Sequence, residues 1–169
     1  INGSPVVTVD YPASVLNVLY RLTTGKFLEG EDPYSVDSLA RSTVKYPCNC
    51  MINNPSQLSA ASAATNRFDE LTKAEREQFH KDRKRHTSIK AMMKLITDRN
   101  GPIAECFFQG KGAGQRYAWH EQNLVFEVAR LLARMDVPAL TVHDEFIVPV
   151  DMVEAVHEVR YTTAFTDLW

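Results

Sequence analysis

The sequence has few cysteines, no long apolar run and almost no net charge. Its three cysteines are odd in number and show no four-ligand zinc pattern, so we expect reduced, buried or partly buried thiols. No apolar stretch approaches the roughly 20 residues of a membrane span and no signal peptide opens the chain, so we expect a cytoplasmic protein without a membrane partner. The formal net charge of -2 is unlike the strongly basic balance of many nucleic-acid-binding domains.

What the sequence does contain is the composition of one globular domain. With 44% hydrophobic and 24% charged residues, its 169 residues can bury one sizeable core. Charge is unevenly distributed, because a basic cluster follows the acid-rich stretch 70–77. The cluster contains Lys81, Arg83, Lys84, Arg85, His86 and Lys90. It either contacts nucleic-acid phosphates or forms a solvated helix face, and the sequence leaves both interpretations open.

Two adjacent carboxylates interrupt an apolar run near the end of the chain. The run 139–149 holds His143, Asp144 and Glu145 between two blocks of β-branched and aliphatic residues. These blocks predict a β-hairpin with the triplet at its tip. Paired acids in such a place suit a divalent cation, as in phosphoryl-transfer enzymes, although an isolated Asp-Glu pair is more often a solvated turn.

Another acid follows a strand-like run near the start of the chain. Residues 5–9 lead into Asp10, and apolar residues then recur at helical spacing over 15–22. The pattern predicts a strand, an aspartate and a helix. Two-metal sites bring carboxylates together from distant parts of a sequence, so Asp10 is a candidate partner of Asp144.

A third pattern combines cations and amides at helical spacing. Arg41, Lys45, Asn49 and Asn53 are each four residues apart, so they share a face if the segment is one helix. Arg and Lys one turn apart suit a triphosphate, although the same pattern is common on helix surfaces. Pro47 predicts that this helix is bent or ends early.

The remaining segments predict mostly helices. Helices are expected over 59–64, 87–97, 119–135 and 152–160. Another should begin at a capping box formed by Thr72 and Glu75. A short strand is expected over 102–108, followed by a flexible glycine turn over 110–114.

Taken in order, the three motifs resemble those of the family A DNA polymerases, the family of DNA polymerase I. The resemblance extends by pattern over residues 5–54 and 101–150. It implies that Asp10, Tyr11 and Asp144 bind two Mg²⁺ ions, for which Mn²⁺ can substitute. Asp10, Asp144 and Glu145 would then be the catalytic residues, with Glu145 as the accessory acid.

The same resemblance assigns the other motif residues to substrates. Arg41 and Lys45 would contact the triphosphate from the fingers helix, and His143 would lie near the primer terminus. The implied activity is DNA-directed DNA polymerase, that is, nucleotidyl transfer from deoxynucleoside triphosphates to a primer 3′-hydroxyl. Primer-template DNA and deoxynucleoside triphosphates would be the partners, in a bacterial or phage-infected cell.

Three features of the family pattern are missing, at four positions of this chain. The family has a Glu that crowds the sugar 2′ position where this chain has Val15, so sugar selection is expected to be weaker. On the fingers helix an aromatic residue and a Tyr-Gly pair are replaced by Asn49 and by Asn53 with Asn54. These departures indicate a divergent, compact relative, of the kind found in phages and mobile elements.

The expected fold class is α+β, a polymerase palm with a small antiparallel sheet and helical fingers. The palm would comprise residues 1–36 and 101–169, and the fingers-like region residues 37–100. Nine residues precede Asp10, so we expect a fragment without the thumb, with thumb, exonuclease domain or accessory replication proteins supplied elsewhere.

Two alternatives remain open from the sequence. A single-subunit RNA polymerase also has a palm with an acidic hairpin, but its triplet tends to read His-Asp-Ser, so Glu145 favours a DNA polymerase. The other alternative is a palm-like module that binds DNA or a protein without catalysis. Such a module need not bind Mg²⁺ through Asp10 and Asp144.

Overall fold

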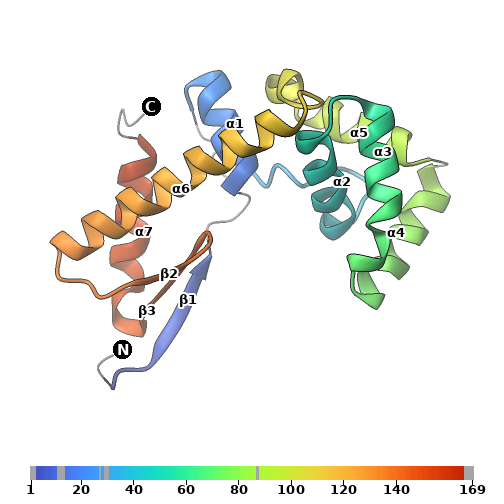
Figure 1. Cartoon of the computed structure of the whole chain (residues 1–169). Coiled ribbons are helices and arrows are strands. Elements are labelled where there is room, and N and C mark those ends of the chain that lie inside the picture. Colours follow the sequence, from blue (N-terminus) through green and yellow to red (C-terminus); the bar gives the residue numbers. More distant parts are fainter. Residues whose placement is uncertain (1–2, 11–13, 27, 29–30, 87, 166–169) are drawn as a thin grey trace. The chain divides into compact units, whose positions relative to one another are not determined.

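The chain folds into helices and one small sheet, which confirms the α+β class (Figure 1). The computed structural model describes residues 3–10, 14–26, 28, 31–86 and 88–165. Its strands are β1 (Val6–Asp10), β2 (Leu140–Val142) and β3 (Glu145–Pro149). Its α-helices are α1 (Ser14–Thr24), α2 (Arg41–Asn53), α3 (Gln57–Asn66), α4 (Lys73–His86), α5 (Ile89–Arg99), α6 (Lys111–Arg134) and α7 (Val153–Phe165). Short 3-10 turns are η1 (Phe68–Glu70), η2 (Gly101–Cys106) and η3 (Val150–Met152).

The chain divides into two compact units. Unit 1 comprises Ile1–Val18 and Tyr117–Trp169, so it is discontinuous in sequence, and unit 2 comprises Leu19–Arg116. The sequence predicted borders at 36/37 and 100/101, whereas these units meet at 18/19 and 116/117. Each unit has its own packing, and each carries a different part of the predicted chemistry.

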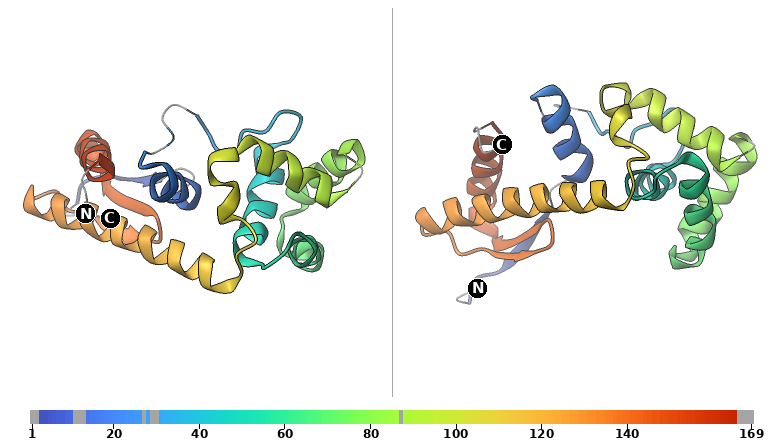
Figure 2. Two further views of the ribbon diagram at one scale, coloured as in Figure 1. Left: turned by 90° about the horizontal axis from the view of Figure 1, so that it is seen from above. Right: turned by 45° about the horizontal axis from the view of Figure 1, so that its top comes forward.

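Unit 1 is built on an antiparallel sheet with strand order β1-β3-β2. Val9 pairs with Phe146 and Val7 with Val148 across β1 and β3. Val9, Phe146 and Val148 are buried in a core completed by apolar residues of α6 and α7. The helix residues of this core are Leu124, Val125, Val128, Leu132, Val156 and Val159. Figures 1 and 2 show α6 and α7 beside the sheet, and the shared core places both on one of its faces.

Helix α6 begins well before the sequence predicted. The expected glycine turn over 110–114 is wrong, because α6 starts at Lys111 and includes two of these glycines. Gly114 permits a close approach, since a Cβ atom there would lie 1.9 Å from Oδ1 of Asn53 on α2. Gly110, with φ of 91°, supplies the left-handed residue just before the helix. The glycines therefore start and pack a helix instead of forming a flexible turn.

In unit 2, helices α2 to α5 pack against one another. Buried Asn100 joins distant segments, because its amide donates to the carbonyl of Pro33 (3.1 Å) and accepts from the Tyr20 hydroxyl (3.0 Å). The capping box predicted at the start of α4 is confirmed, with Glu75 accepting from the backbone and hydroxyl of Thr72. Similar side-chain caps begin α3 at Ser56 and α5 at Ser88.

The strand predicted over 102–108 is wrong. Residues of this segment form η2, which begins with a proline in its first turn and buries Ile103. Phe108 then donates its backbone N–H to the carbonyl of Met51 on α2 (2.7 Å). The described residues of unit 2 offer this segment helices and no strand to pair with. A short apolar run therefore took the conformation that its neighbours allowed.

Candidate functional site

The three predicted catalytic acids lie together at one end of the unit 1 sheet. Asp10 is the last residue of β1, and its register partner across the strands is Glu145, the first residue of β3. Val142 of β2 pairs with Glu145 on the other side, so His143 and Asp144 form a two-residue hairpin turn. The predicted hairpin with the triplet at its tip is confirmed.

The acids face away from the apolar core. Side chains alternate along a strand, and residues directly opposite on neighbouring strands point to the same face. Val9 and Phe146 form the adjacent pair and are buried, so Asp10 and Glu145 lie on the other face. Asp10 is exposed, and Asp144 and Glu145 are partly buried. An ion or substrate can therefore reach this end of the sheet from solvent.

The pairing of Asp10 with Glu145 opposes like charges. The Cβ atoms of directly opposite residues are about 4.5–5.5 Å apart, and like charges in such pairs destabilise a sheet. A third acid, Asp144, occupies the adjoining position of the turn, so negative charge is concentrated at this end of the sheet. A bound cation would remove this repulsion, which is why the arrangement suits a metal site.

The donor set fits Mg²⁺ by its chemistry. Among the described residues, no group of three or more His, Cys, Asp or Glu side chains is arranged to hold an ion. Mg²⁺ does not require one, because it keeps several waters and binds through one or two carboxylates together with substrate phosphates. Asp10 at the end of β1 and Asp144 in the turn before β3 could supply two hard oxygen ligands. Tyr11, the third predicted metal residue, lies outside the described residues.

His143 is the first residue of the hairpin turn and is exposed. Its φ of 55° is uncommon for a residue with a side chain, and histidine is among the residue types enriched at such angles. The turn thereby presents the imidazole to solvent beside the acids. Its contact with a primer terminus stays a prediction.

The predicted cationic face of unit 2 is confirmed as a shared helix face. Arg41, Lys45, Asn49 and Asn53 all lie on α2 and are all exposed. The opposite side of the helix is buried, with Val44, Cys48 and Met51 fully covered. Pro47 lies inside the helix and faces the core, so the helix neither ends early nor loses its exposed face.

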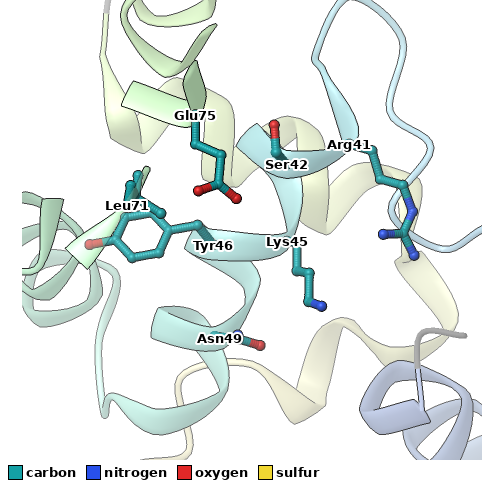
Figure 3. Close-up of a pocket in the computed structure, with 7 residues that line it drawn as sticks. All are labelled: Arg41, Ser42, Lys45, Tyr46, Asn49, Leu71 and Glu75. Atoms are coloured by element: carbon teal, nitrogen blue, oxygen red, sulfur yellow. The ribbon is translucent and has the colours of Figure 1, made fainter. Parts of the chain in front are cut away.

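Arg41 and Lys45 line an open pocket of about 530 Å³, which Figure 3 shows. The other lining residues are Ser42, Tyr46, Asn49, Leu71 and Glu75. Binding sites for small molecules typically have volumes of roughly 300–1,000 Å³, so this pocket is large enough to hold part of a nucleotide. Two cations and several hydrogen-bonding groups in one hollow favour an anionic ligand.

Arg41 is held in place by the loop before α2. Its Nε donates to a carboxylate oxygen of Asp32 at 2.6 Å, and its guanidinium lies 5.1 Å from the ring centre of Tyr34. The other carboxylate oxygen of Asp32 accepts the backbone N–H of Tyr34 at 3.0 Å. Because the pair is about half exposed, it contributes little stability but orients the guanidinium. The Nη groups remain the natural donors to a ligand.

Glu75 sets a negative charge at the edge of this pocket. Hydrogen bonds from the hydroxyl and the backbone of Thr72 lower the pKa of its carboxyl, and the nearby charge of Lys45 lowers it further. The carboxylate therefore stays ionised near neutral pH and partly offsets the two cations. Leu71 and Glu75 were missed as site residues, because only tertiary packing brings the start of α4 and the residues just before it beside α2.

Tyr46 is the aromatic residue of the pocket. Its hydroxyl donates to the carbonyl of Ala64 (2.8 Å), and its ring packs edge-on against Phe79. Burial raises the pKa of Tyr46 to about 12, so it remains a hydrogen-bond donor. The expected position of an aromatic on this helix, by family pattern, is instead occupied by exposed Asn49. In the sequence, only its position next to Lys45 could have indicated that Tyr46 lines the pocket.

None of the three cysteines lines this pocket. Cys48 and Cys50 are buried and Cys106 is partly buried, and all three are free, as expected. Burial, reinforced by the neighbouring Cys50, raises the pKa of the Cys48 thiol. Cys48 is therefore unreactive near neutral pH and packs as a small apolar residue.

The structure thus brings together Asp10, Asp144 and Glu145 in unit 1, and Arg41 with Lys45 in unit 2. In the part of the chain that is described, no helix combines the length and apolar character needed to cross a membrane. The chain matches no model of a known protein family, no curated protein and no solved structure.

Proposed function

We propose that the chain is the palm and fingers portion of a template-directed DNA polymerase. The observation that carries this proposal is the pairing of Asp10 with Glu145 at the end of the sheet, with Asp144 in the adjoining turn. Two like charges directly opposite each other, Asp10 and Glu145, destabilise the sheet, and a bound cation would relieve this repulsion. The cationic pocket of α2 supports the same proposal, because a triphosphate needs both metal ions and cations.

In the proposed mechanism, Asp10 and Asp144 would hold Mg²⁺ through their carboxylate oxygens. Mg²⁺, when bound, would supply Lewis-acid stabilisation of phosphate charge and lower the pKa of a primer 3′-hydroxyl. That hydroxyl gives its proton to solvent water and its oxygen bonds to the α-phosphorus of the incoming nucleotide. The bond from the α-phosphorus to the bridging oxygen of the β-phosphate breaks, and pyrophosphate leaves with its electron pair. Glu145 would act as the accessory acid opposite Asp10. Arg41 and Lys45 would neutralise negative charge on oxygens of the triphosphate.

Primer extension tests this proposal. The longest available form of the protein is incubated with a primed DNA template, Mg²⁺ and four deoxynucleoside triphosphates, beside its Asp144→Ala variant. We expect template-directed extension by the parent protein and its loss in the variant. Exposed Asp151 of η3 offers a matched control, since Asp151→Asn removes an acid of the same unit and should leave extension unchanged.

The same assay separates the alternatives. Val15 lies on α1, where the family pattern has a Glu, so we expect some incorporation of ribonucleotides beside deoxynucleotides. Preferential use of ribonucleotides would instead indicate an RNA polymerase. A folded parent protein that binds primed DNA but never extends it would contradict the proposal and favour a non-catalytic module.

A further inference from the structure

A second hollow in unit 2 lies between α3 and the junction of α4 with α5, the helices labelled in Figure 1. It is an open groove of about 300 Å³. We call it the α3–α5 groove and define it by Leu58, Ser62, Thr65, Arg83, Ser88 and Lys90. None of these residues lines the pocket of Arg41 and Lys45, so the two hollows are separate surfaces of unit 2.

The groove lies in the most basic part of the chain. Residues 81–90 contain five Lys or Arg and one acid, Asp82, although the whole chain has a net charge of -2. Asp82 is buried and faces inward, accepting hydrogen bonds from the backbone N–H of Ala40 (3.1 Å) and from Gln78 (3.1 Å). The acid therefore anchors α4 within unit 2, and the positive charges of the segment face outward.

The cations in and beside this segment differ in whether they already have a partner within the protein. Arg85 donates to the carbonyl of Ser38, and Lys94 on α5 pairs with Asp98 at 2.6 Å. Arg83 and Lys90 are exposed, and among the described residues neither forms an ion pair with a carboxylate. The two groove cations are therefore available to an external anion, whereas others are already engaged.

The wall of the groove adds neutral groups between these cations. Ser62 and Thr65 present hydroxyls on α3, and the Ser88 hydroxyl caps α5 by accepting the backbone N–H of Ala91 (3.1 Å). Leu58 is 67% exposed and adds an apolar side chain to the groove wall. Cations, hydroxyls and an exposed apolar side chain match the phosphate, sugar and base of a nucleotide.

We propose that the α3–α5 groove binds the backbone of single-stranded DNA, with Arg83 and Lys90 contacting phosphates and Leu58 packing against a base or sugar. The groove is too small to enclose a duplex, so a single strand is the form that could lie inside it. Sites for single strands track the phosphate backbone with a positive groove and usually add aromatic side chains on which bases stack. In this groove Leu58 is the exposed apolar side chain, so the phosphate contacts of Arg83 and Lys90 are expected to dominate. The inference goes beyond the proposed function, because binding at this groove requires neither Mg²⁺ nor a triphosphate.

Fluorescence anisotropy with labelled oligodeoxythymidine tests the proposal, using the full chain in EDTA at salt concentrations from about 50 to 200 mM. Removing both groove cations by Arg83→Gln with Lys90→Gln should weaken binding on the order of tenfold. The slope of log affinity against log salt should fall by about 1.4, because each neutralised phosphate of a single strand contributes roughly 0.7. Ser62→Trp keeps both cations but fills the groove, and it should weaken binding as well.

The matched control is Lys73→Gln with Lys94→Gln, which removes the same charge from α4 and α5 outside the groove. It should retain most of the affinity. An equal loss in this control, no loss in Ser62→Trp, or tighter binding of duplex than of single strand would overturn the proposal. Because EDTA removes the metal ions, single-stranded DNA binding can persist in a protein that fails to extend a primer, so the two proposals fail separately.

Discussion

At the scale of single residues, the most informative positions are the acids that oppose each other across β1 and β3. Asp10 and Glu145 occupy paired positions that hydrophobic or oppositely charged residues would fill more favourably. The sequence showed that both acids interrupt apolar runs, but it could not show that they are direct neighbours. That fact depends on strand register, which is set by the buried partners Val9 and Phe146.

This repulsion predicts that neutralising one acid stabilises the metal-free protein. Asp10→Asn should raise the free energy of unfolding by roughly 0.2–1 kcal/mol in EDTA, because it removes one of two like charges directly opposite. Urea unfolding followed by circular dichroism measures this change. Asp151→Asn is the control, and it should give no increase, since an acid just before α7 is favourable near a helix start. A destabilised Asp10→Asn protein would show that the carboxylate is structural.

At the scale of elements, α2 illustrates what periodicity reveals and what it misses. The four-residue spacing of Arg41, Lys45, Asn49 and Asn53 correctly predicted one exposed face. Pro47 suggested a bend or an early end, but α2 continues past it to Asn53. The opposite wall of the pocket comes from α4, more than 20 positions away, and no local pattern contains that information. The same limit explains the segment 102–108, whose short apolar run fits a strand or a turn equally well.

The pocket places the positive charge of Lys45 on α2 near the negative charge of Glu75 on α4. Neutralising one or the other should therefore change nucleotide affinity in opposite directions. Lys45→Gln should weaken binding of a fluorescent deoxynucleoside triphosphate about 10- to 100-fold, because a charge-assisted contact is lost. Glu75→Gln should strengthen it about two- to fivefold, because the pocket loses a negative charge. Glutamine can still accept the capping hydrogen bonds from Thr72, so the helix start is retained. Unchanged affinity in Lys45→Gln would remove this pocket from nucleotide binding.

At the scale of the whole molecule, two units share the proposed chemistry. Unit 1 supplies acids on a sheet whose other face is buried by helices, and unit 2 supplies cations on a helical surface. The sequence correctly predicted the α+β class, the hairpin and the exposed face of α2. It misplaced the start of α6, because glycines that look like a turn can also allow the close approach of Gly114 and Asn53. Local patterns identify elements, whereas contacts between distant segments decide where each element begins.

The most direct measurement is the rate of single-nucleotide incorporation by the parent protein and by Asp10→Asn on primed DNA with Mg²⁺. Thermal melting of both proteins is recorded alongside, with Asp151→Asn as the control. We expect incorporation to fall by at least about a hundredfold in Asp10→Asn, since losing a metal ligand removes several kcal/mol of transition-state stabilisation. The melting temperature in EDTA should be equal or higher. An Asp10→Asn protein that incorporates nucleotides within a few-fold of the parent would contradict the metal-binding role of the paired acids, and with it the proposed polymerase.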